Sequence, residues 1–133
     1  MHMDPVVHFE MPAENGKRMS EFYSKSFGWK TTQLGSENAG YILTATSECD
    51  EKGYPIKPGR INGGFYQKKN DMPMQYPSVV IAVQNVQDSM KKVKDSGGKV
   101  LGEPMDIPGY GTYVSFLDTE GNRVSMMQPL PGM

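Results

Sequence analysis

The chain has 133 residues, 37% of them hydrophobic and 10% aromatic, which is enough for one domain with a hydrophobic core. Its 14 basic and 15 acidic residues leave a net charge of -1, which argues against electrostatic capture of nucleic acid or an anionic membrane. Cys49 is the single cysteine, so an intrachain disulfide is excluded and a cytoplasmic location is expected. No apolar run approaches the roughly 20 residues of a membrane helix.

The first half of the chain predicts one helix among four strands. Residues 5–11 alternate apolar and polar side chains, which is typical of a strand, and Pro12 is expected to end it. Asn15 is a candidate N-cap for a helix that stops at Gly28. Apolar residues at helical spacing predict a buried stripe of Met19, Phe22, Tyr23 and Phe27. Three further short strands are expected at 29–33, 40–46 and 62–67.

The second half repeats this order. A strand is predicted at 78–83, and Asn85 with Asp88 resembles a capping box before a helix. Val86, Met90 and Val93 form the apolar stripe of that helix, which ends at Gly97 and Gly98. Three strands follow at 99–107, 111–119 and 123–128, and residues 118–122 give a strong hairpin-turn signal.

The order of strand, helix and three strands therefore occurs twice, as a repeat of pattern and not of residue identity. One such unit is too small to bury both its helix and its sheet faces. We expect the two units to pair around a cavity, with the helices outside. The inner faces would carry His8 and Glu10 from the first unit and Ser78, Val80 and Ala82 from the second.

Five segments carry a likeness to a known family. They are HFEMPAENGKRMSEFYSKSFGW, GYILT, GRINGGFY, PSVVIAVQNVQDSMKKVKDSGGKV and FLDTEGNRVSMMQP. In this order they resemble the vicinal oxygen chelate superfamily, which includes glyoxalase I, extradiol dioxygenases and bleomycin-resistance proteins. The resemblance implies an α+β fold with two βαβββ modules paired around a cavity. It implies a single domain over 1–133, with module 1 at about 5–70 and module 2 at about 77–129.

In metal-dependent members of this family, ligands come from the inner faces of the first and last strand of each module. His8 matches the first ligand position, whereas Ser78 and Ser125 occupy two others and Gly63 and Gly64 lie near the fourth. A divalent ion needs three or more converging donors, and serines and glycines are poor substitutes. We therefore expect no metal and no cofactor.

His8 and Glu10 have two interpretations. They form either a satisfied polar pair on a partly wet face or a ligand-contacting pair, with His8 as hydrogen-bond donor or base and Glu10 as its orienter. The catalytic residues, if the chain is an enzyme, are unknown beyond these two candidates. An inward charged side chain needs a partner, so the module 1 side of the cavity is expected to be polar.

Other side chains are candidates for ligand contact or for the core. Aromatic residues that either line the cavity or pack in the core are Trp29, Tyr41, Tyr110 and Tyr113. Met127 shares the inner face of the last strand with Ser125, and Arg123 either meets an anionic ligand or is solvated at the strand end. The expected ligand-binding set is His8, Glu10, Tyr41, Ser78, Tyr110, Tyr113, Arg123, Ser125 and Met127.

Three functions stay open. The first is a metal-independent small-molecule-binding protein of glyoxalase/bleomycin-resistance type. The second is a glyoxalase-like lyase, isomerase or dioxygenase that uses His8 and Glu10. The third is an interaction partner whose cavity is vestigial. The expected partner is a small molecule, with no nucleic acid and no membrane, and a homodimer is a hypothesis for the assembly.

Overall fold

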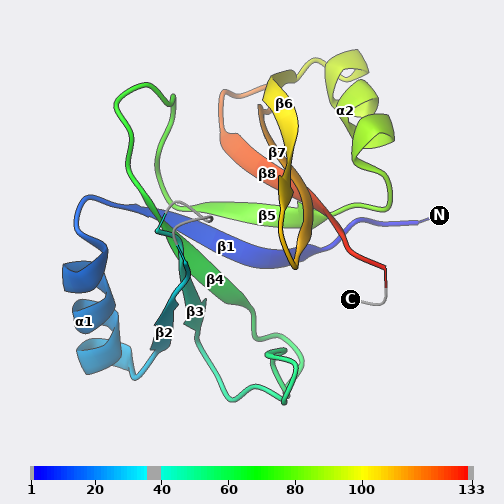
Figure 1. Cartoon of the computed structure of the whole chain (residues 1–133). Helices are drawn as coiled ribbons and strands as arrows, with labels where there is room; N and C mark the ends of the chain where they lie inside the picture. The colour runs from blue at the N-terminus through cyan, green and yellow to red at the C-terminus, as the bar shows by residue number, and fades with distance from the viewer. Residues whose placement is uncertain (1, 36–39, 132–133) are drawn as a thin grey trace. The chain divides into compact units, whose positions relative to one another are not determined.

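The computed structural model describes residues 2–35 and 40–131. Its elements in chain order are β1 Val6–Ala13, α1 Gly16–Phe27, β2 Lys30–Gln33, β3 Ile42–Ala45, β4 Asn62–Gln67, β5 Ser78–Ala82, α2 Val86–Asp95, β6 Lys99–Ile107, β7 Gly111–Leu117 and β8 Arg123–Pro129 (Figure 1). This order is the expected double βαβββ pattern, and the predicted α+β fold class is confirmed.

The chain divides into two compact units, each with its own strands and helix. The first module comprises His8–Pro77, and the second comprises Ser78–Met133 together with Met1–Val7. The N-terminal residues belong with the second module in part because the Ala82 N–H donates to the Pro5 carbonyl at 2.9 Å.

The two modules have the same internal strand arrangement. In the first module the strand order is β2-β3-β4-β1, and in the second it is β6-β7-β8-β5. The opening strand lies parallel to the closing strand in each, β1 with β4 and β5 with β8, while the other pairs are antiparallel. Each opening strand thus lies beside the closing strand of its own module, where their same-face side chains can meet.

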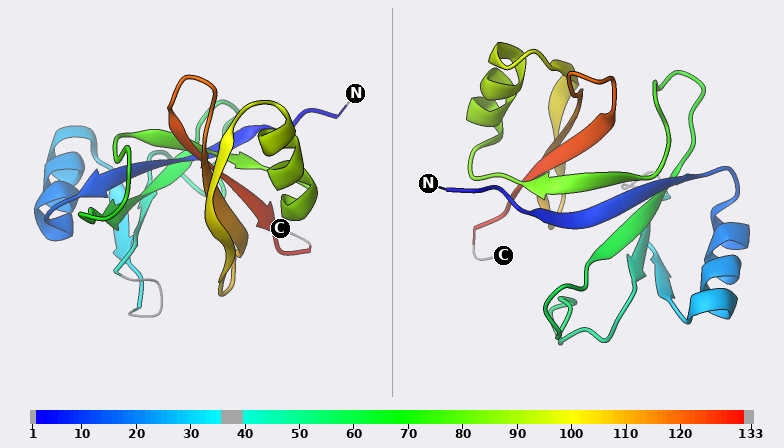
Figure 2. Two further views of the ribbon diagram at one scale, coloured as in Figure 1. Left: turned by 90° about the horizontal axis from the view of Figure 1, so that it is seen from above. Right: turned by 180° about the vertical axis from the view of Figure 1, so that it is seen from behind.

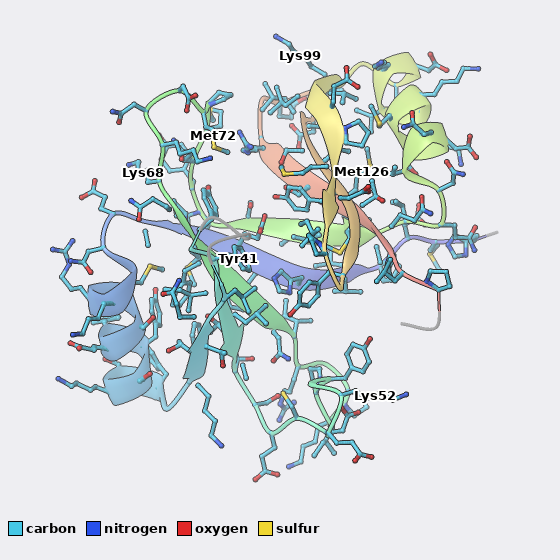
Figure 3. All side chains as sticks on the ribbon, in the orientation of Figure 1. Tyr41, Lys52, Lys68, Met72, Lys99 and Met126 are labelled. Atoms are coloured by element: carbon cyan, nitrogen blue, oxygen red, sulfur yellow. The ribbon has the colours of Figure 1, made fainter. Side chains whose placement is uncertain are left out.

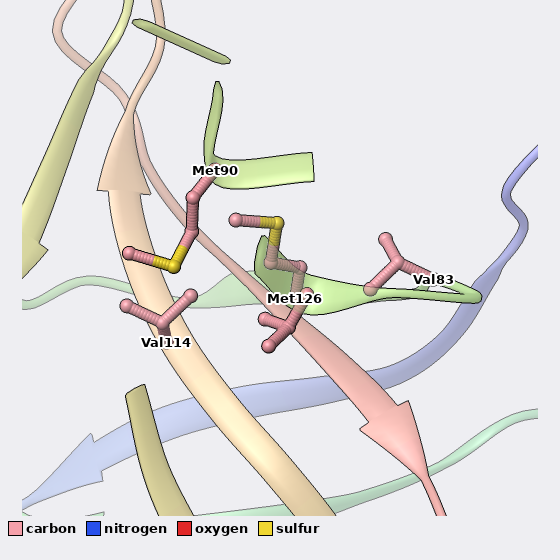
Figure 4. Packing of buried hydrophobic residues seen from close by; sticks show 5 residues of the cluster. Val83, Met90, Val114 and Met126 are labelled. Carbon is pink, nitrogen blue, oxygen red and sulfur yellow. The ribbon is translucent and has the colours of Figure 1, made fainter. Parts of the chain in front are cut away.

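The core of the second module lies between α2 and the strands. Val83, Val86, Met90, Val114 and Met126 form its buried cluster (Figure 4). The predicted stripe of α2 is confirmed, because Val86 and Met90 are buried and Val93 packs against them. Asn85 caps this helix as expected, since its Oδ1 accepts from the Asp88 N–H at 3.0 Å.

The core of the first module is smaller and more aromatic. Ala13, Ile42 and Phe65 are buried, with Phe9, Met19, Tyr23 and Trp29 packed around them. Helix α1 lies beside its strands in all three views of the ribbon (Figures 1 and 2). Its predicted ends are confirmed: Asn15 Oδ1 accepts from the Arg18 N–H at 3.0 Å, and Gly28 adopts the left-handed conformation at φ 74°.

Two predictions about the first module are wrong. Phe22 and Phe27 do not belong to a buried stripe, because they are 56% and 65% exposed and none of the twelve residues described in α1 is fully buried. Strand β1 also continues through Pro12 to Ala13. The proline lies one residue before the strand end, and the pairing continues beyond it, since the Ala13 carbonyl accepts from the Lys68 N–H at 2.9 Å.

Candidate functional site

A hydrogen-bonded trio occupies one face of the first module. His8 and Glu10 lie two residues apart on β1, and Tyr41 precedes β3. The Tyr41 hydroxyl donates to Glu10 Oε2 at 3.0 Å and lies 3.0 Å from His8 Nε2. The sequence indicates Glu10 as a candidate orienter of His8. In the structure the Tyr41 hydroxyl lies between the two side chains and bonds to both (Tyr41 is labelled in Figure 3).

The proton positions in this trio follow from its donors. The single hydroxyl proton of Tyr41 goes to Glu10, so the Tyr41 oxygen accepts from His8. His8 therefore carries a proton on Nε2, and in the neutral ring Nδ1 keeps its lone pair. Within the described chain, Tyr41 is the only hydrogen-bond partner of the His8 ring. The trio presents an acceptor nitrogen on a half-buried ring.

Burial keeps His8 neutral. Removal of the ring from solvent lowers the pKa of His8 from 6.5 to about 4, because an imidazolium is less well solvated there than in water. At neutral pH the ring is then an uncharged donor and acceptor. Glu10, in contrast, is only 7% exposed and depends on hydrogen bonds such as the one from Tyr41.

Two adjacent glycines on β4 have different roles. Gly64 is in register with Glu10, and a Cβ there would overlap the ring and hydroxyl of Tyr41. Gly63 is in register with Phe9, and a Cβ there would overlap the Phe9 ring on the core side. Gly64 is therefore the residue that makes room for Tyr41 to bridge His8 and Glu10.

The second module carries its own chain of hydroxyl groups on β7 and β8. Ser125 Oγ lies 2.7 Å from Tyr113 Oη and 2.8 Å from Ser115 Oγ. Arg123 Nη2 donates to Ser115 Oγ at 3.4 Å. Ser115 and Ser125 are buried, while Tyr113 and Arg123 are half-buried. Arg123 is thus anchored to the strands rather than simply solvated at a strand end.

The remaining predicted residues stand apart from these networks. Ser78 begins β5 and is half-buried, and Tyr110 lies in the turn between β6 and β7. Met127 follows the buried Met126 on β8 and is half-buried. Trp29 belongs to the first-module core, because its ring stacks on Tyr23 with centroids 4.6 Å apart and planes at 9°.

Sequence reasoning missed Ser115 and the specific role of Gly64. Both could have been found from strand register. The turn at 118–122 places Ser115 opposite Ser125 in the β7–β8 hairpin, and the parallel pairing of β1 and β4 places Gly64 beside Glu10. The sequence contains this information, but it can be used only once the pairing of two strands is known, because the pattern of a single strand does not reveal it.

The residues at the family's metal positions do not fit a metal ion. Among residues 2–35 and 40–131, no three His, Cys, Asp or Glu side chains are grouped so that they could hold one. His8 already donates through Nε2, Gly64 has no side chain, and Ser125 lies within a hydroxyl chain. A borderline or hard divalent ion requires three or more strong donors at one point.

Comparison with known proteins shows the family. The chain belongs to the Glyoxalase/Bleomycin resistance protein/Dioxygenase superfamily, which matches residues 6–126. The expected membership of the vicinal oxygen chelate superfamily is confirmed. A glyoxylase-like domain-containing protein of Didymella fabae is 30% identical over 120 residues, which are 88% of each chain.

A second relative and a solved structure of similar fold were also found. The anthracycline biosynthesis protein DnrV of Streptomyces peucetius is 24% identical over 127 residues, and the chain spans 42% of its length. A methylmalonyl-CoA epimerase of Streptomyces coelicolor, in complex with 2-nitronate-propionyl-CoA, has a TM-score of 0.69 at 12% identity over 98% of this chain and 97% of the other. That likeness shows the fold alone. Within the described residues, no helix is long and apolar enough to cross a membrane.

Proposed function

We propose that the chain is a metal-independent small-molecule-binding protein of glyoxalase/bleomycin-resistance type. The ligand-contacting residues of this proposal are His8, Glu10 and Tyr41 in the first module and Ser78, Tyr110, Tyr113, Arg123, Ser125 and Met127 in the second. Family membership supports the general class, since a superfamily neighbour of the same fold holds a small organic molecule in its solved structure.

One observation carries the proposal: the trio of His8, Tyr41 and Glu10 holds the imidazole neutral and in one tautomer. A ring fixed in this way offers the same acceptor nitrogen at every pH from about 5 upward. It recognises a donor group on a ligand by an ordinary hydrogen bond, at a site where the ring is already oriented before binding.

The alternative is a glyoxalase-like lyase, isomerase or dioxygenase that uses His8 and Glu10. Proton abstraction works best when the pKa of the base lies near the working pH. A His8 pKa of about 4 makes the ring a weak base at neutral pH. The same burial that suits His8 to recognition therefore argues against it as a general base.

Metal independence has separate support in the donor set. The space beside Glu10 on β4, where a ligand side chain would begin, is taken by Tyr41. Restoring a ligand there would require a side chain at position 64 and the removal of the tyrosine. The two serines at the other family positions are weak ligands for a divalent ion.

A thermal-shift screen tests the proposal. The purified chain is screened with Zn²⁺, Ni²⁺ and Mg²⁺, with glutathione adducts and with planar aromatic compounds, each with and without EDTA. The likeness to an anthracycline biosynthesis protein makes anthracyclines part of the aromatic set. Tyr41→Phe is the site variant, and Tyr76→Phe, at a 65% exposed tyrosine, is the matched control.

We expect an organic compound to raise the Tm in the presence of EDTA. Binding at 100 times Kd stabilises by about 2.7 kcal/mol, a shift of several degrees for a domain of this size. The shift should fall in Tyr41→Phe and persist in Tyr76→Phe. Stabilisation by a metal alone, or only by metal and compound together, contradicts metal independence, and turnover of a glutathione adduct supports the enzyme alternative.

A further inference from the structure

The loop between β3 and β4, residues 46–61, is folded back on itself. Asn62, the first residue of β4, closes its base. The Asn62 Oδ1 accepts from the Thr46 N–H at 3.3 Å, and its Nδ2 donates to the Gly53 carbonyl at 2.9 Å. The Thr46 hydroxyl also donates to the Ile61 carbonyl at 2.6 Å, which joins the two ends of the loop. The loop therefore has a defined shape, because its base and its far side are bonded to the same asparagine side chain.

A pocket of about 310 Å³ lies in this loop (Lys52, on the same loop, is labelled in Figure 3). That volume is at the lower end of the range of roughly 300–1,000 Å³ that small-molecule sites occupy. The Ile56 N–H donates to the Glu48 carbonyl at 3.0 Å, which holds two lining residues together. The lining residues are Ser47, Glu48, Ile56, Lys57 and Arg60, and none of them is among the ligand-contacting residues proposed above.

The charged groups of this pocket are not neutralised by the protein. Lys57 and Arg60 are cations and Glu48 is an anion, so the lining has one positive charge in excess. In the part of the chain that the structure describes, none of these three side chains forms an ion pair. The pocket thus presents two free cations and one free carboxylate on a loop of defined shape.

These groups define the chemistry of a ligand. A guanidinium presents donors in a planar fork that matches a carboxylate, and one carboxylate balances the excess charge. A phosphate monoester carries about two negative charges at neutral pH, which is more than this excess. Glu48 can only accept hydrogen bonds, so it matches a hydroxyl group on the same molecule. Ile56 is 60% exposed and offers apolar surface to a short hydrocarbon chain.

We infer that the pocket in loop 46–61 binds small carboxylates that also carry a hydroxyl group. Arg60 and Lys57 hold the carboxylate, Glu48 accepts the hydroxyl proton, and Ile56 contacts the hydrocarbon between them. This site does not depend on the proposed function, because it uses different residues.

The test compares three probes of similar shape: 3-hydroxybutyrate, butyrate without the hydroxyl, and butane-1,3-diol without the carboxylate. Dissociation constants are measured at constant ionic strength by ¹H–¹⁵N NMR titration of the intact chain, from the amide signals of residues 46–61. The variants are Arg60→Gln, Lys57→Gln and Glu48→Ala. Lys52→Gln is the matched control, since it removes an exposed cation of the same loop that does not line the pocket.

We expect 3-hydroxybutyrate to bind with a dissociation constant on the order of 1 mM, as suits so small a ligand. Butyrate should bind about threefold more weakly and the diol at least about tenfold more weakly. Arg60→Gln and Lys57→Gln should weaken 3-hydroxybutyrate by about three- to tenfold, and Lys52→Gln by less than about twofold. In Glu48→Ala the difference between 3-hydroxybutyrate and butyrate should disappear.

Four results would overturn the inference. They are no shift of the loop amides up to about 50 mM 3-hydroxybutyrate, equal binding of the diol, tighter binding of inorganic phosphate, and equal losses in Arg60→Gln and Lys52→Gln. The last result would mean that the loop attracts anions only through its general charge. A thermal-shift response that falls in Tyr41→Phe would leave the proposed function standing in each case.

Discussion

The two modules share one strand arrangement but build their polar networks from different groups. In the first module a tyrosine hydroxyl joins two titratable side chains, His8 and Glu10, and leaves an acceptor nitrogen on the ring. In the second module two serines join a permanent cation, Arg123, to Tyr113. The same fold thus supports one network built around a buried histidine and another anchored by a permanent cation.

Among substitutions in the polar networks, the largest effect is expected from Gly64→Ala, which disrupts the first network alone. The added methyl group would overlap the Tyr41 ring, and displacement of that ring breaks both of its hydrogen bonds. We expect a loss of about 3 kcal/mol in the free energy of unfolding, measured with urea.

A double-mutant cycle with Tyr41→Ala supplies the control. The cost of Gly64→Ala should shrink when Tyr41 is already truncated, because the overlapping atoms are gone. If the losses from the two substitutions add, Gly64 and Tyr41 act independently, which would contradict the role of Gly64 in making room for Tyr41.

The next effect is the pH dependence of the free energy of unfolding, which we expect from His8 in the first module. Between pH 6.5 and about 4 the unfolded chain binds a proton at His8 and the folded chain does not. Stability therefore rises with pH across this window and the contribution is complete above 6.5. The fall in pKa corresponds to up to about 3 kcal/mol, lost as the pH drops from 6.5 to about 4.

His8→Gln is the matched variant for this measurement. The glutamine amide can replace the donor to Tyr41 but does not titrate. The free energy of unfolding is measured with urea at several pH values for both chains. The difference between the unaltered chain and His8→Gln should change between pH 6.5 and about 4. Parallel stability curves would mean that His8 is charged equally in both states.

A smaller loss is expected for Tyr41→Phe. It removes one hydroxyl, leaves the buried Glu10 without that donor and deprives His8 Nε2 of its acceptor. The cost should be about 1–2 kcal/mol. Tyr76→Phe should stay within about 0.5 kcal/mol, since that side chain is mostly exposed. Equal effects of the two substitutions would show that the trio contributes nothing.

The smallest effect is expected on the helix. Phe22→Gln should change the free energy of unfolding by less than about 0.5 kcal/mol, because Phe22 is 56% exposed and glutamine is a good helix former. Met90→Ala on α2 should cost about 2–5 kcal/mol. Comparable losses from the two substitutions would show that both helices pack equally well.

Most strands and both helices could be predicted from the sequence, because alternation and helical spacing are local signals. The exposure of Phe22 and Phe27 could not be predicted, because both fall at the same helical periodicity as Met19 and Tyr23, at i, i+3, i+4 and i+8. Which of these four side chains is covered depends on how far the strands of the first module extend beneath α1. A short sheet with glycines on β4 and a stacked Trp29 offers contact to Tyr23 and leaves Phe22 and Phe27 outside.

For the candidate site, the sequence identified His8, Glu10 and Tyr41 but not the bond between them. Tyr41 lies more than thirty residues from His8, and only the pairing of β3 with β4 brings its hydroxyl to β1. The residue types at the family's metal-ligand positions could be read from the sequence alone, because glycine has no donor side chain and serine is a weak ligand.

The most direct test of the account is the protonation state of His8 in solution. Long-range ¹H–¹⁵N NMR of the histidine rings, with His8 assigned by loss of its signals in His8→Gln, reports which ring nitrogen carries the proton. The account predicts a neutral ring protonated on Nε2 at pH 7, with a titration midpoint at about 4. A ring protonated on Nδ1, or a midpoint at or above 6.5, would contradict it.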